Sequence, residues 1–425
     1  MSEDYKLRIA DALLERKLAG KGAVLIEGPK WCGKTTTAEH HCHSAVYMSD
    51  NKNKLAYAEL AEVDPDALLD GDTPHLIDEW QVSPSLWDAV RFAVDHRKGL
   101  GHFILTGSAV PGDTQNIVHT GTGRFSWLTM RPMSLWESGD SNGKVSLSLL
   151  FSSPEKITAK NNANLRKIAF LICRGGWPQA TNLEGQVALD QARDYFDAVV
   201  KRDIKRVDSV ERDTSQAKRL MRSYARHQGT QASINVICQD MTANGTGGLT
   251  PETVSSYIAA LKKIFVIEDV EAWNPNLRSK TAIRTSDTRY FVDPSIAAAS
   301  LGLGPDDLIN DLNTMGLFFE TLCMRDLRVF AEALDGEVFH YRDKSGLECD
   351  AVVHLRNGSY GLIEIKLGGD KLTEEGALTL KKLASQIDSE RMKDPSFLMI
   401  LTAVGDFAYR RTDGIYIVPI GCLKD

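Results

Sequence analysis

A glycine-rich run near the N-terminus has the composition and spacing of a phosphate-binding loop. The run GPKWCGKT matches GxxxxGK[ST] at every fixed position, and a short apolar stretch precedes it. Glycine lets the backbone close around a phosphate without a Cβ clash, so that amide N–H groups and the start of the next helix face the anion. A glycine turn before a helix is the alternative. The residues expected to line the phosphate are Gly28, Pro29, Lys30, Trp31, Cys32, Gly33, Lys34, Thr35 and Thr36.

Side-chain chemistry suggests individual roles at this site. Lys34 is expected to reach the β and γ phosphates of a bound triphosphate, and Thr35 is expected to hold a magnesium ion. The later run TPHLIDEWQ places Asp78 and Glu79 where a short buried strand ends. Asp78 suits the second magnesium position. Glu79 suits a general base that orients water, which favours hydrolysis over transfer to another substrate. The alternative is an acidic turn after the strand.

Three more polar residues are candidates for the same chemistry. Thr106 and Ser108 end the apolar run of FILTGS, and Ser108 is the choice for a group that senses the γ phosphate or positions water. The triplet TGS is also a common strand-ending turn. Arg124, in HTGTGRFSW, can act as an arginine finger on the γ phosphate of a neighbouring subunit. A surface arginine that caps a loop is the equally weighted alternative.

The candidate residues follow different strands, so they can form one site only if a sheet brings the ends of those strands together. Apolar runs predict strands at 23–27, 75–77 and 103–105, and the spacing of apolar residues predicts a helix over 84–96. Strands alternating with helices indicate an α/β fold with a parallel sheet. The loop lies between the first strand and the first helix of this pattern, which is where a phosphate site of this type occurs.

Length and composition set the wider limits. The chain has 425 residues, which predicts two to four domains. A net charge of −7 requires any nucleic-acid contact to use a local basic face. Seven scattered cysteines favour a reducing compartment, and no apolar run approaches the roughly 18 residues that cross a bilayer. We therefore expect a cytoplasmic protein with no membrane partner.

The motifs GPKWCGKT, LIDEW, FILTGS and GRF, followed by RPMSLWE and RGGWP, resemble those of prokaryotic AAA-type ATPases that carry an uncharacterised C-terminal domain. The likeness covers essentially the whole chain. It implies a P-loop NTPase core over 1–140 with ATP and Mg²⁺ as ligands, and a linker and helical lid over 141–213. Arg174 is a candidate second nucleotide sensor in that lid, with a surface arginine as the alternative. Residues 142–164 are expected to be a loop or linker.

The middle of the chain has the order of a winged helix-turn-helix, assigned to 214–300. Thr250 is a natural N-cap with Pro251 at the first helical position, so a helix should begin there. A major-groove helix with a basic wing would contact DNA, whereas a winged helix used for protein packing is at least as compatible with the net acidity. The wing candidates are Arg278, Lys280, Arg284 and Arg289.

The last part, 301–425, predicts an amphipathic helix and three strands, and it resembles the PD-(D/E)xK nuclease core. Asp350 lies on the second strand, and period-2 alternation puts Glu364 and Lys366 on one face of the third. Glu320 on the preceding helix is a possible further acid. Two carboxylates can hold a second divalent metal while Lys366 orients water. Alternating charges on a half-exposed strand, in a fold that has lost activity, would give the same pattern.

Two hypotheses follow. In the first, the chain hydrolyses ATP and acts on DNA through its C-terminal half. In the second, it is a nucleotide-gated binding or scaffold switch with an inactive nuclease-like domain. A small-molecule P-loop kinase is disfavoured because Glu79 directly follows Asp78. The expected partners are ATP, DNA in the first hypothesis, and either further copies of the chain, with Arg124 acting in trans, or an unidentified protein.

Overall fold

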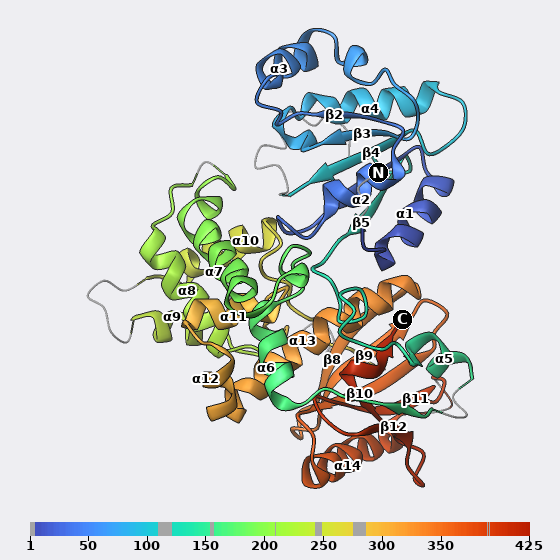
Figure 1. Cartoon of the computed structure of the whole chain (residues 1–425), viewed down its shortest axis with the longest axis vertical. Coiled ribbons are helices and arrows are strands. Elements are labelled where there is room, and N and C mark those ends of the chain that lie inside the picture. The colour runs from blue at the N-terminus through green and yellow to red at the C-terminus, as the bar shows by residue number, and fades with distance from the viewer. Residues whose placement is uncertain are drawn as a thin grey trace. The chain divides into compact units, whose positions relative to one another are not determined.

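A computed structural model describes residues 5–108, 121–153, 157–208, 210–242, 249–274, 286–388, 390 and 392–425. The chain forms two compact units. Unit 1 contains Met1–Pro132, Lys201–Arg212 and Ala259–Val266, and unit 2 contains Met133–Val200, Asp213–Ile258 and Ile267–Asp425. Figure 1 follows the elements from the N-terminus in blue to the C-terminus in red.

Unit 1 is built on a five-stranded parallel sheet. The first strand pairs in register with both of its neighbours, with Ala23 opposite Phe103 on one side and opposite Phe125 on the other. Because all strands run in the same direction, their carboxyl ends meet at one edge of the sheet. In spatial order the strands are β2 (Ser44–Tyr47), β3 (His75–Asp78), β4 (Phe103–Gly107), β1 (Ala23–Glu27) and β5 (Phe125–Thr129).

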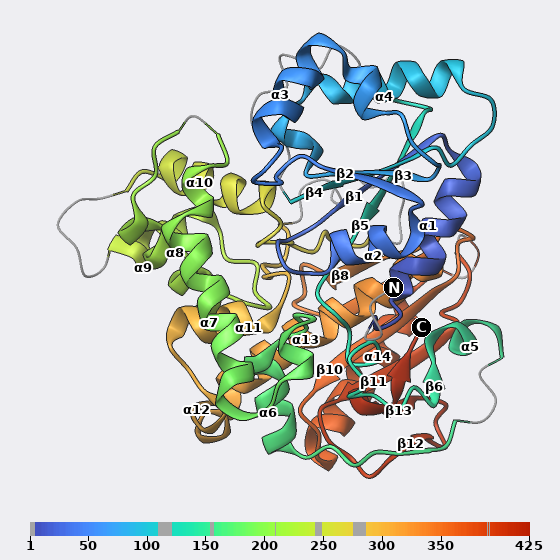
Figure 2. The ribbon, with the colours of Figure 1, turned by 45° about the horizontal axis from the view of Figure 1, so that its top comes forward.

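Helices cover both faces of this sheet (Figure 2). Alternation along β1 sends Val24 and Ile26 to the core that contains Leu14 and Ala38, and sends Leu25 to the opposite core with Trp87. The first face is covered by α1 (Ile9–Gly20) and α2 (Lys34–His41), and the second by α3 (Lys54–Val63), η1 (Pro65–Leu68) and α4 (Ser85–His96). The predicted first strand and the helix over 84–96 are confirmed.

The first part of unit 2 is helical. Helix α10 begins at Pro251, and the Thr250 hydroxyl accepts from the Thr253 amide at 3.3 Å, as expected for the N-cap. Two isolated antiparallel bridges, Ile267 with Phe291 and Val270 with Thr288, follow. The helices are α6 (Leu165–Arg174), α7 (Gly185–Lys201), α8 (Thr214–Arg226), α9 (Ile234–Thr242), α10 (Pro251–Lys263), α11 (Pro294–Leu301) and α12 (Pro305–Asn310). The last residue of α7 and residues 259–263 of α10 belong to unit 1.

The second part of unit 2 is a seven-stranded mixed sheet with the order β7-β12-β13-β11-β10-β9-β8. Helix α13 (Leu312–Ala333) contacts β8, β9 and β10, and α14 (Asp370–Gln386) packs on β9, β10 and β11. The strands are β8 (Gly336–Arg342), β9 (Glu348–Leu355), β10 (Tyr360–Lys366), β11 (Phe397–Thr402), β12 (Phe407–Arg410) and β13 (Tyr416–Pro419). The predicted helix and its three following strands are present.

Residues 142–164 differ from the expected loop or linker. They contain β6 (Val145–Ser146), α5 (Leu147–Ser152) and β7 (Ala159–Lys160). Strand β7 pairs antiparallel with β12, and β6 pairs in parallel with β14 (Leu423–Lys424). Two-residue strands carry too little periodicity to be seen in a sequence, and their partners lie far away in the chain.

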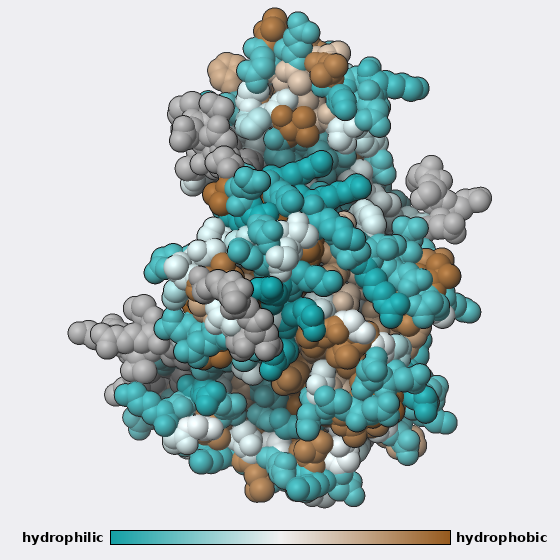
Figure 3. Space-filling view, turned by 90° about the vertical axis from the view of Figure 1, so that its left-hand side faces the viewer, coloured by the Kyte–Doolittle hydropathy of each residue, from teal (hydrophilic) through white to brown (hydrophobic). Residues whose placement is uncertain are grey.

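Within the part of the chain that the structure describes, no helix is long and apolar enough to cross a membrane. On the face drawn in Figure 3, hydrophobic residues occur in small groups between hydrophilic ones.

Candidate functional site

The phosphate-binding loop connects β1 to α2 in unit 1. Gly28 has a φ of 148°, and a Cβ at this position would lie 2.1 Å from the carbonyl oxygen of Met130. Gly33 has a φ of 101° and precedes the first residue of α2. Both positions therefore require glycine, because a side chain would be strained at either and would clash at the first. The loop ends at a helix N-terminus, which favours a bound anion.

Lys34 lies inside the loop and is 5% exposed. Its ammonium group donates to the carbonyl oxygens of Gly28 at 3.0 Å and Pro29 at 2.8 Å. Both acceptors are neutral, so negatively charged phosphate oxygens would be stronger partners for the same ammonium group. The residues present therefore fit a bound triphosphate.

Asp78 joins the loop to the neighbouring strand ends. Its Oδ1 accepts from the Thr35 hydroxyl at 2.7 Å and from the Thr106 hydroxyl at 2.6 Å, and the residue is 6% exposed. The sequence placed these three residues in one site, and the structure brings them together. A carboxylate beside a threonine hydroxyl is a set of hard oxygen donors, which fits Mg²⁺.

Glu79 follows Asp78 in the left-handed region, with a φ of 56°. Its amide donates to the Thr106 hydroxyl at 3.2 Å, and its carboxylate Oε2 accepts from the Ser108 hydroxyl at 3.2 Å. The side-chain amide of Gln81 donates to the same Oε2. Ser108 thus lies beside the candidate general base, and its expected role in sensing the γ phosphate or positioning water stays a prediction. Gln81, two residues after Glu79 in DEWQ, was not predicted from the sequence.

Contacts with residues outside the loop also brace it, and the sequence did not indicate these contacts. Lys30 forms an ion pair of 2.6 Å with Asp203, in η4 (Asp203–Lys205) of unit 1. The guanidinium group of Arg8 donates to the carbonyl oxygens of Cys32 at 2.8 Å and Arg131 at 2.9 Å. Trp31 stays 57% exposed. These contacts join segments that are far apart in the sequence, so no local pattern indicates them.

Arg124 lies at the other edge of the sheet. Its carbonyl oxygen accepts from the amide of Ala23, which begins β1, whereas the loop follows the far end of that strand. Five residues of strand separate the two ends, which is roughly 16 Å. The guanidinium group pairs with Asp95 through Nε at 2.9 Å and Nη2 at 3.1 Å. Arg124 therefore does not face the loop of its own chain.

Unit 2 holds the second group of candidate residues. Lys366 donates to Asp350 Oδ2 at 3.1 Å and pairs with Glu364 Oε2 at 2.6 Å. Glu364 and Lys366 therefore lie on one face of β10, as predicted. Asp350 also accepts from the amide of Ile365 at 2.7 Å. These three side chains line a cavity of about 380 Å³ together with Thr379 and Lys382 of α14 and five further residues.

Glu320 lies next to this group in a narrower cavity of about 30 Å³, which also contains Asp350. The Tyr290 hydroxyl donates to Glu320 Oε1. Burial, and then the charge of Asp350, raises the pKa of both Glu320 and Glu364 to about 8. Burial alone would lower the pKa of Lys366, but the adjacent carboxylates outweigh it and the pKa is raised.

The expected second metal site has no preformed ligand cluster. Among the described residues, no three or more His, Cys, Asp or Glu side chains are arranged to hold a metal ion. One reason is that Lys366 stands between the carboxylates of Asp350 and Glu364.

Two arginines that were expected to be accessible are held by acids. Arg174 is 4% exposed and pairs with Asp140 at 2.8 Å, so it is not a surface arginine. Arg289, a candidate for the basic wing, pairs with Asp269 at 2.7 Å. The other wing candidates, Arg278, Lys280 and Arg284, lie outside the described residues.

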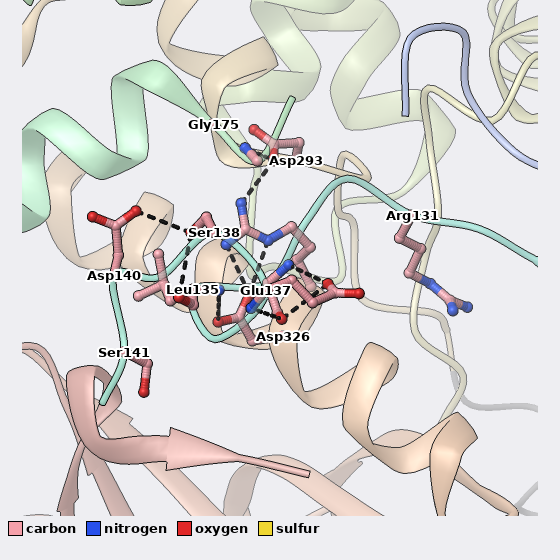
Figure 4. Close-up of polar contacts among 12 residues, drawn as sticks. Arg131, Leu135, Glu137, Ser138, Asp140, Ser141, Gly175, Asp293 and Asp326 are labelled. Atoms are coloured by element: carbon pink, nitrogen blue, oxygen red, sulfur yellow. Dashed lines mark hydrogen bonds and ion pairs between the residues drawn. The ribbon is translucent and has the colours of Figure 1, made fainter. Parts of the chain in front are cut away.

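Within unit 2, the part of RPMSLWE from Met133 to Glu137 contacts the segment GGWP. The Met133 amide donates to the Gly176 carbonyl oxygen at 2.6 Å. Both segments are anchored on buried acids: the Gly176 amide donates to Asp293 at 3.0 Å, and the Leu135 amide donates to Asp326 at 2.9 Å. Arg325 pairs with Asp293 at 2.9 Å and with Asp326 at 2.7 Å (Figure 4). The two motifs therefore make structural contacts within the fold, and they are not part of the phosphate-binding loop.

Comparison with known proteins divides the chain into three matched segments. Residues 20–138 match a family described as an AAA domain. Residues 165–307 and 315–423 match two families described as domains of unknown function, DUF8612 and DUF4143. Two uncharacterised proteins, from Mycobacterium bovis and Mycobacterium tuberculosis, are each 24% identical over 361 residues, which is 84% of this chain and 73% of the relative.

Two solved structures are also similar. A Walker-type ATPase of Pyrococcus abyssi is 14% identical, with a TM-score of 0.43, and the match covers 70% of this chain and 97% of that one. The ORC2 protein of Aeropyrum pernix, solved as ADPNP–ADP complexes, is 13% identical with a TM-score of 0.33, covering 73% and 97%. Residues 20–138 are thus similar to an AAA domain, and they contain the loop from Gly28 to Thr36 and the strand that ends at Asp78.

Proposed function

We propose that the chain binds ATP with Mg²⁺ in the loop from Gly28 to Thr36 and hydrolyses it. The observation that carries the proposal is the position of Asp78, whose Oδ1 accepts from both Thr35 and Thr106. This arrangement puts the loop, the candidate metal acid and the next strand end within hydrogen-bonding distance. Glu79 is the following residue, so a general base lies beside the candidate metal position.

The side chains have separate roles in this proposal. The loop amides and Lys34 bind the phosphates, and Thr35 and Asp78 hold the metal. A bound Mg²⁺ supplies positive charge that offsets the charge developing on the phosphate oxygens. Glu79 takes the proton of the attacking water, and Ser108, which donates to Glu79, keeps that carboxylate oriented. Thr106 links Asp78 to the backbone of Glu79, so the metal acid and the base move together.

Nucleotide binding is tested with a change of Lys34. We expect wild-type protein to bind ATP with Mg²⁺ by calorimetry and to release phosphate, and Lys34→Ala to lose binding. The exposed Lys98→Ala serves as the control, because it removes the same charge elsewhere in unit 1. A wild-type chain with no affinity for any nucleoside triphosphate would overturn the proposal.

Arg124 enters the proposal as a finger in trans. Its place at the sheet edge away from its own loop supports action on the site of a second copy. We expect Arg124→Ala to keep ATP binding and to lower turnover on the order of 10³-fold, as loss of such a finger does. Mixing this variant with Lys34→Ala should restore part of the activity, since each supplies what the other lacks. Unchanged turnover in Arg124→Ala would remove the finger from the proposal.

A second candidate function concerns the C-terminal half. We propose that it acts on DNA, with 214–300 as a winged helix and 301–425 as a nuclease-like domain. The contacts of Lys366 with Asp350 and Glu364 support a hydrolytic site at which Lys366 orients water. In this reading Asp350 and Glu364 would hold a divalent metal, which would supply positive charge at the phosphodiester. The alternative is an inactive domain in a nucleotide-gated switch, in which Lys366 permanently neutralises the acids.

The two readings differ in one experiment. Linear and branched DNA is incubated with the full chain, ATP and Mg²⁺ or Mn²⁺, and both cleavage and mobility shift are recorded. Cleavage that Asp350→Asn abolishes and Glu337→Gln keeps supports the nuclease, since Glu337 is an exposed acid on β8. A nucleotide-dependent shift without cleavage supports the switch. Absence of both would exclude DNA as the partner.

A further inference from the structure

Gln81 has an unusual environment for a residue next to a candidate catalytic acid. It lies in η2 (Trp80–Val82), directly after Glu79. Its side-chain carbonyl oxygen Oε1 is buried, and among the described residues it has no hydrogen-bond partner. Buried polar atoms in folded proteins are usually satisfied, and an exception often marks a position that a water or a ligand fills.

The orientation of the Gln81 amide follows from chemistry. The ionised Glu79 carboxylate only accepts hydrogen bonds, so the amide nitrogen of Gln81 must face it and the carbonyl oxygen must face away. The contact from Gln81 Nε2 to Glu79 Oε2 has this arrangement. Ser108 donates to the same oxygen at 3.2 Å. Both donors therefore use Oε2, and Glu79 Oε1 has no hydrogen bond from any described residue.

Gly107, at the end of β4, borders the same place. A Cβ there would lie 3.1 Å from Gln81 Oε1 and 3.2 Å from the indole nitrogen of Trp80. Because Gly107 has no side chain, no Cβ contacts the buried Gln81 carbonyl oxygen from that side. Among the described residues, neither Glu79 Oε1 nor Gln81 Oε1 has a hydrogen-bond partner, and the two side chains touch each other beside the strand end.

We infer that Gln81 positions the attacking water, with its carbonyl oxygen accepting one water proton while Glu79 accepts the other. This inference rests on the proposed ATP hydrolysis and adds a residue to it. A water molecule has two O–H donors, and two acceptors that are fixed relative to each other define the direction of its lone pair. The Gln81 amide has a double role, because its nitrogen orients Glu79 and its oxygen orients the water.

The step balances without a further reactant. The water oxygen forms a bond to the γ phosphorus while the bond from that phosphorus to the β,γ-bridging oxygen breaks. ADP leaves with the electron pair of the broken bond. The proton of the water passes to Glu79 Oε1 and then to solvent, and the products are ADP and inorganic phosphate.

The test compares Gln81→Met with wild type. Methionine has a similar length and no carbonyl or amide group, so it removes both roles and keeps the packing. Gln186→Met on the exposed face of α7 is the control, because that glutamine contacts only Asp190 among the hydrogen bonds identified. Three quantities are measured for each protein: the Kd for ATP, the kcat for phosphate release, and the Kd for ADP with aluminium fluoride. The last complex mimics the transition state of phosphoryl transfer.

We expect Gln81→Met to keep the Kd for ATP, to lower kcat by roughly 10²-fold or more, and to weaken ADP–aluminium fluoride binding by a similar factor. Unchanged kcat and unchanged analogue affinity in a wild type that hydrolyses ATP would overturn the role of Gln81 alone. Loss of ATP binding in Gln81→Met would also overturn it, because the residue would then shape the loop. A wild type without turnover would overturn the hydrolysis proposal itself.

Discussion

The carboxylates of the candidate site in unit 1 and the buried carboxylates of unit 2 have different kinds of hydrogen-bond partner. Asp78 and Glu79 are held by neutral donors, namely the hydroxyls of Thr35, Thr106 and Ser108 and the amide of Gln81. In unit 2 the carboxylates are held by cations: Lys366 pairs with Asp350 and Glu364, and Arg325 pairs with Asp293 and Asp326.

Neutral donors and cations have different consequences for chemistry. A hydroxyl or amide orients a carboxylate and leaves its negative charge uncompensated, so the group can still attract a metal ion or a proton. A buried cation such as Arg325 offsets the charge of its carboxylates and fixes their geometry, which makes the pair a structural element whose loss is costly. The difference suggests that unit 1 is arranged to bind and react, while the charges of unit 2 first of all hold the fold.

The largest expected effect is the loss of ATP hydrolysis when the candidate general base of unit 1 is changed. Glu79→Gln keeps the shape of the side chain and removes the base, so we expect kcat for ATP hydrolysis to fall on the order of 10³-fold with ATP binding retained. Phosphate release and calorimetry measure the two quantities. Glu59→Gln, an exposed acid of α3, should leave both unchanged. A Glu79→Gln protein that still turns over would move the base to another residue.

The next effect concerns the buried ion cluster. Arg325→Met leaves Asp293 and Asp326 buried without their cation, and we expect the free energy of unfolding to drop by about 3–5 kcal/mol. Denaturant unfolding followed by circular dichroism measures the loss. Arg166→Met, whose partner Asp306 is highly exposed, should change it by about 0–1 kcal/mol. Equal effects for both variants would show that the Arg325 cluster does not hold unit 2.

The smallest expected effect is the pH dependence of the free energy of unfolding that comes from Glu364 in unit 2. The pKa of Glu364 is raised to about 8 by burial and by Asp350, above the ordinary value of 4.5. At a pH between 4.5 and about 8, the folded state therefore binds more protons at this group than the unfolded state does. The free energy of unfolding should fall as pH rises from 6 to 8. The slope for one group is at most about 1.4 kcal/mol per pH unit.

Glu364→Gln removes this titrating group, so its unfolding free energy should depend less on pH than that of wild type. Urea unfolding at pH 6, 7 and 8 measures the difference. Glu337→Gln, which changes an exposed acid in the same sheet, should retain the wild-type slope. Identical slopes for Glu364→Gln and wild type would mean that Glu364 is ionised in the folded protein across this range.

Much of the fold was predictable where the signal is local. The strand before the loop, the cap at Thr250 and the three strands around Asp350 and Glu364 follow from short periodic patterns and turn residues. The expectation for 142–164 was wrong in its local structure, because β6 and β7 depend on partners at the far end of the chain. Residues that act through distant partners, such as Arg8 and Asp203, carry no periodic signal at all.

The sequence by itself determined the phosphate-binding loop and its acids. Eight contiguous residues contain all the fixed positions of the motif, and Asp78 and Glu79 directly follow a buried strand. Only the tertiary structure decided which hydroxyls hold these acids, that Arg124 faces away from its own loop, and that Lys366 and Arg325 each join two carboxylates. The reason is physical: a loop motif is set by backbone geometry over a few residues, whereas a buried charge finds its partner only when distant segments pack together.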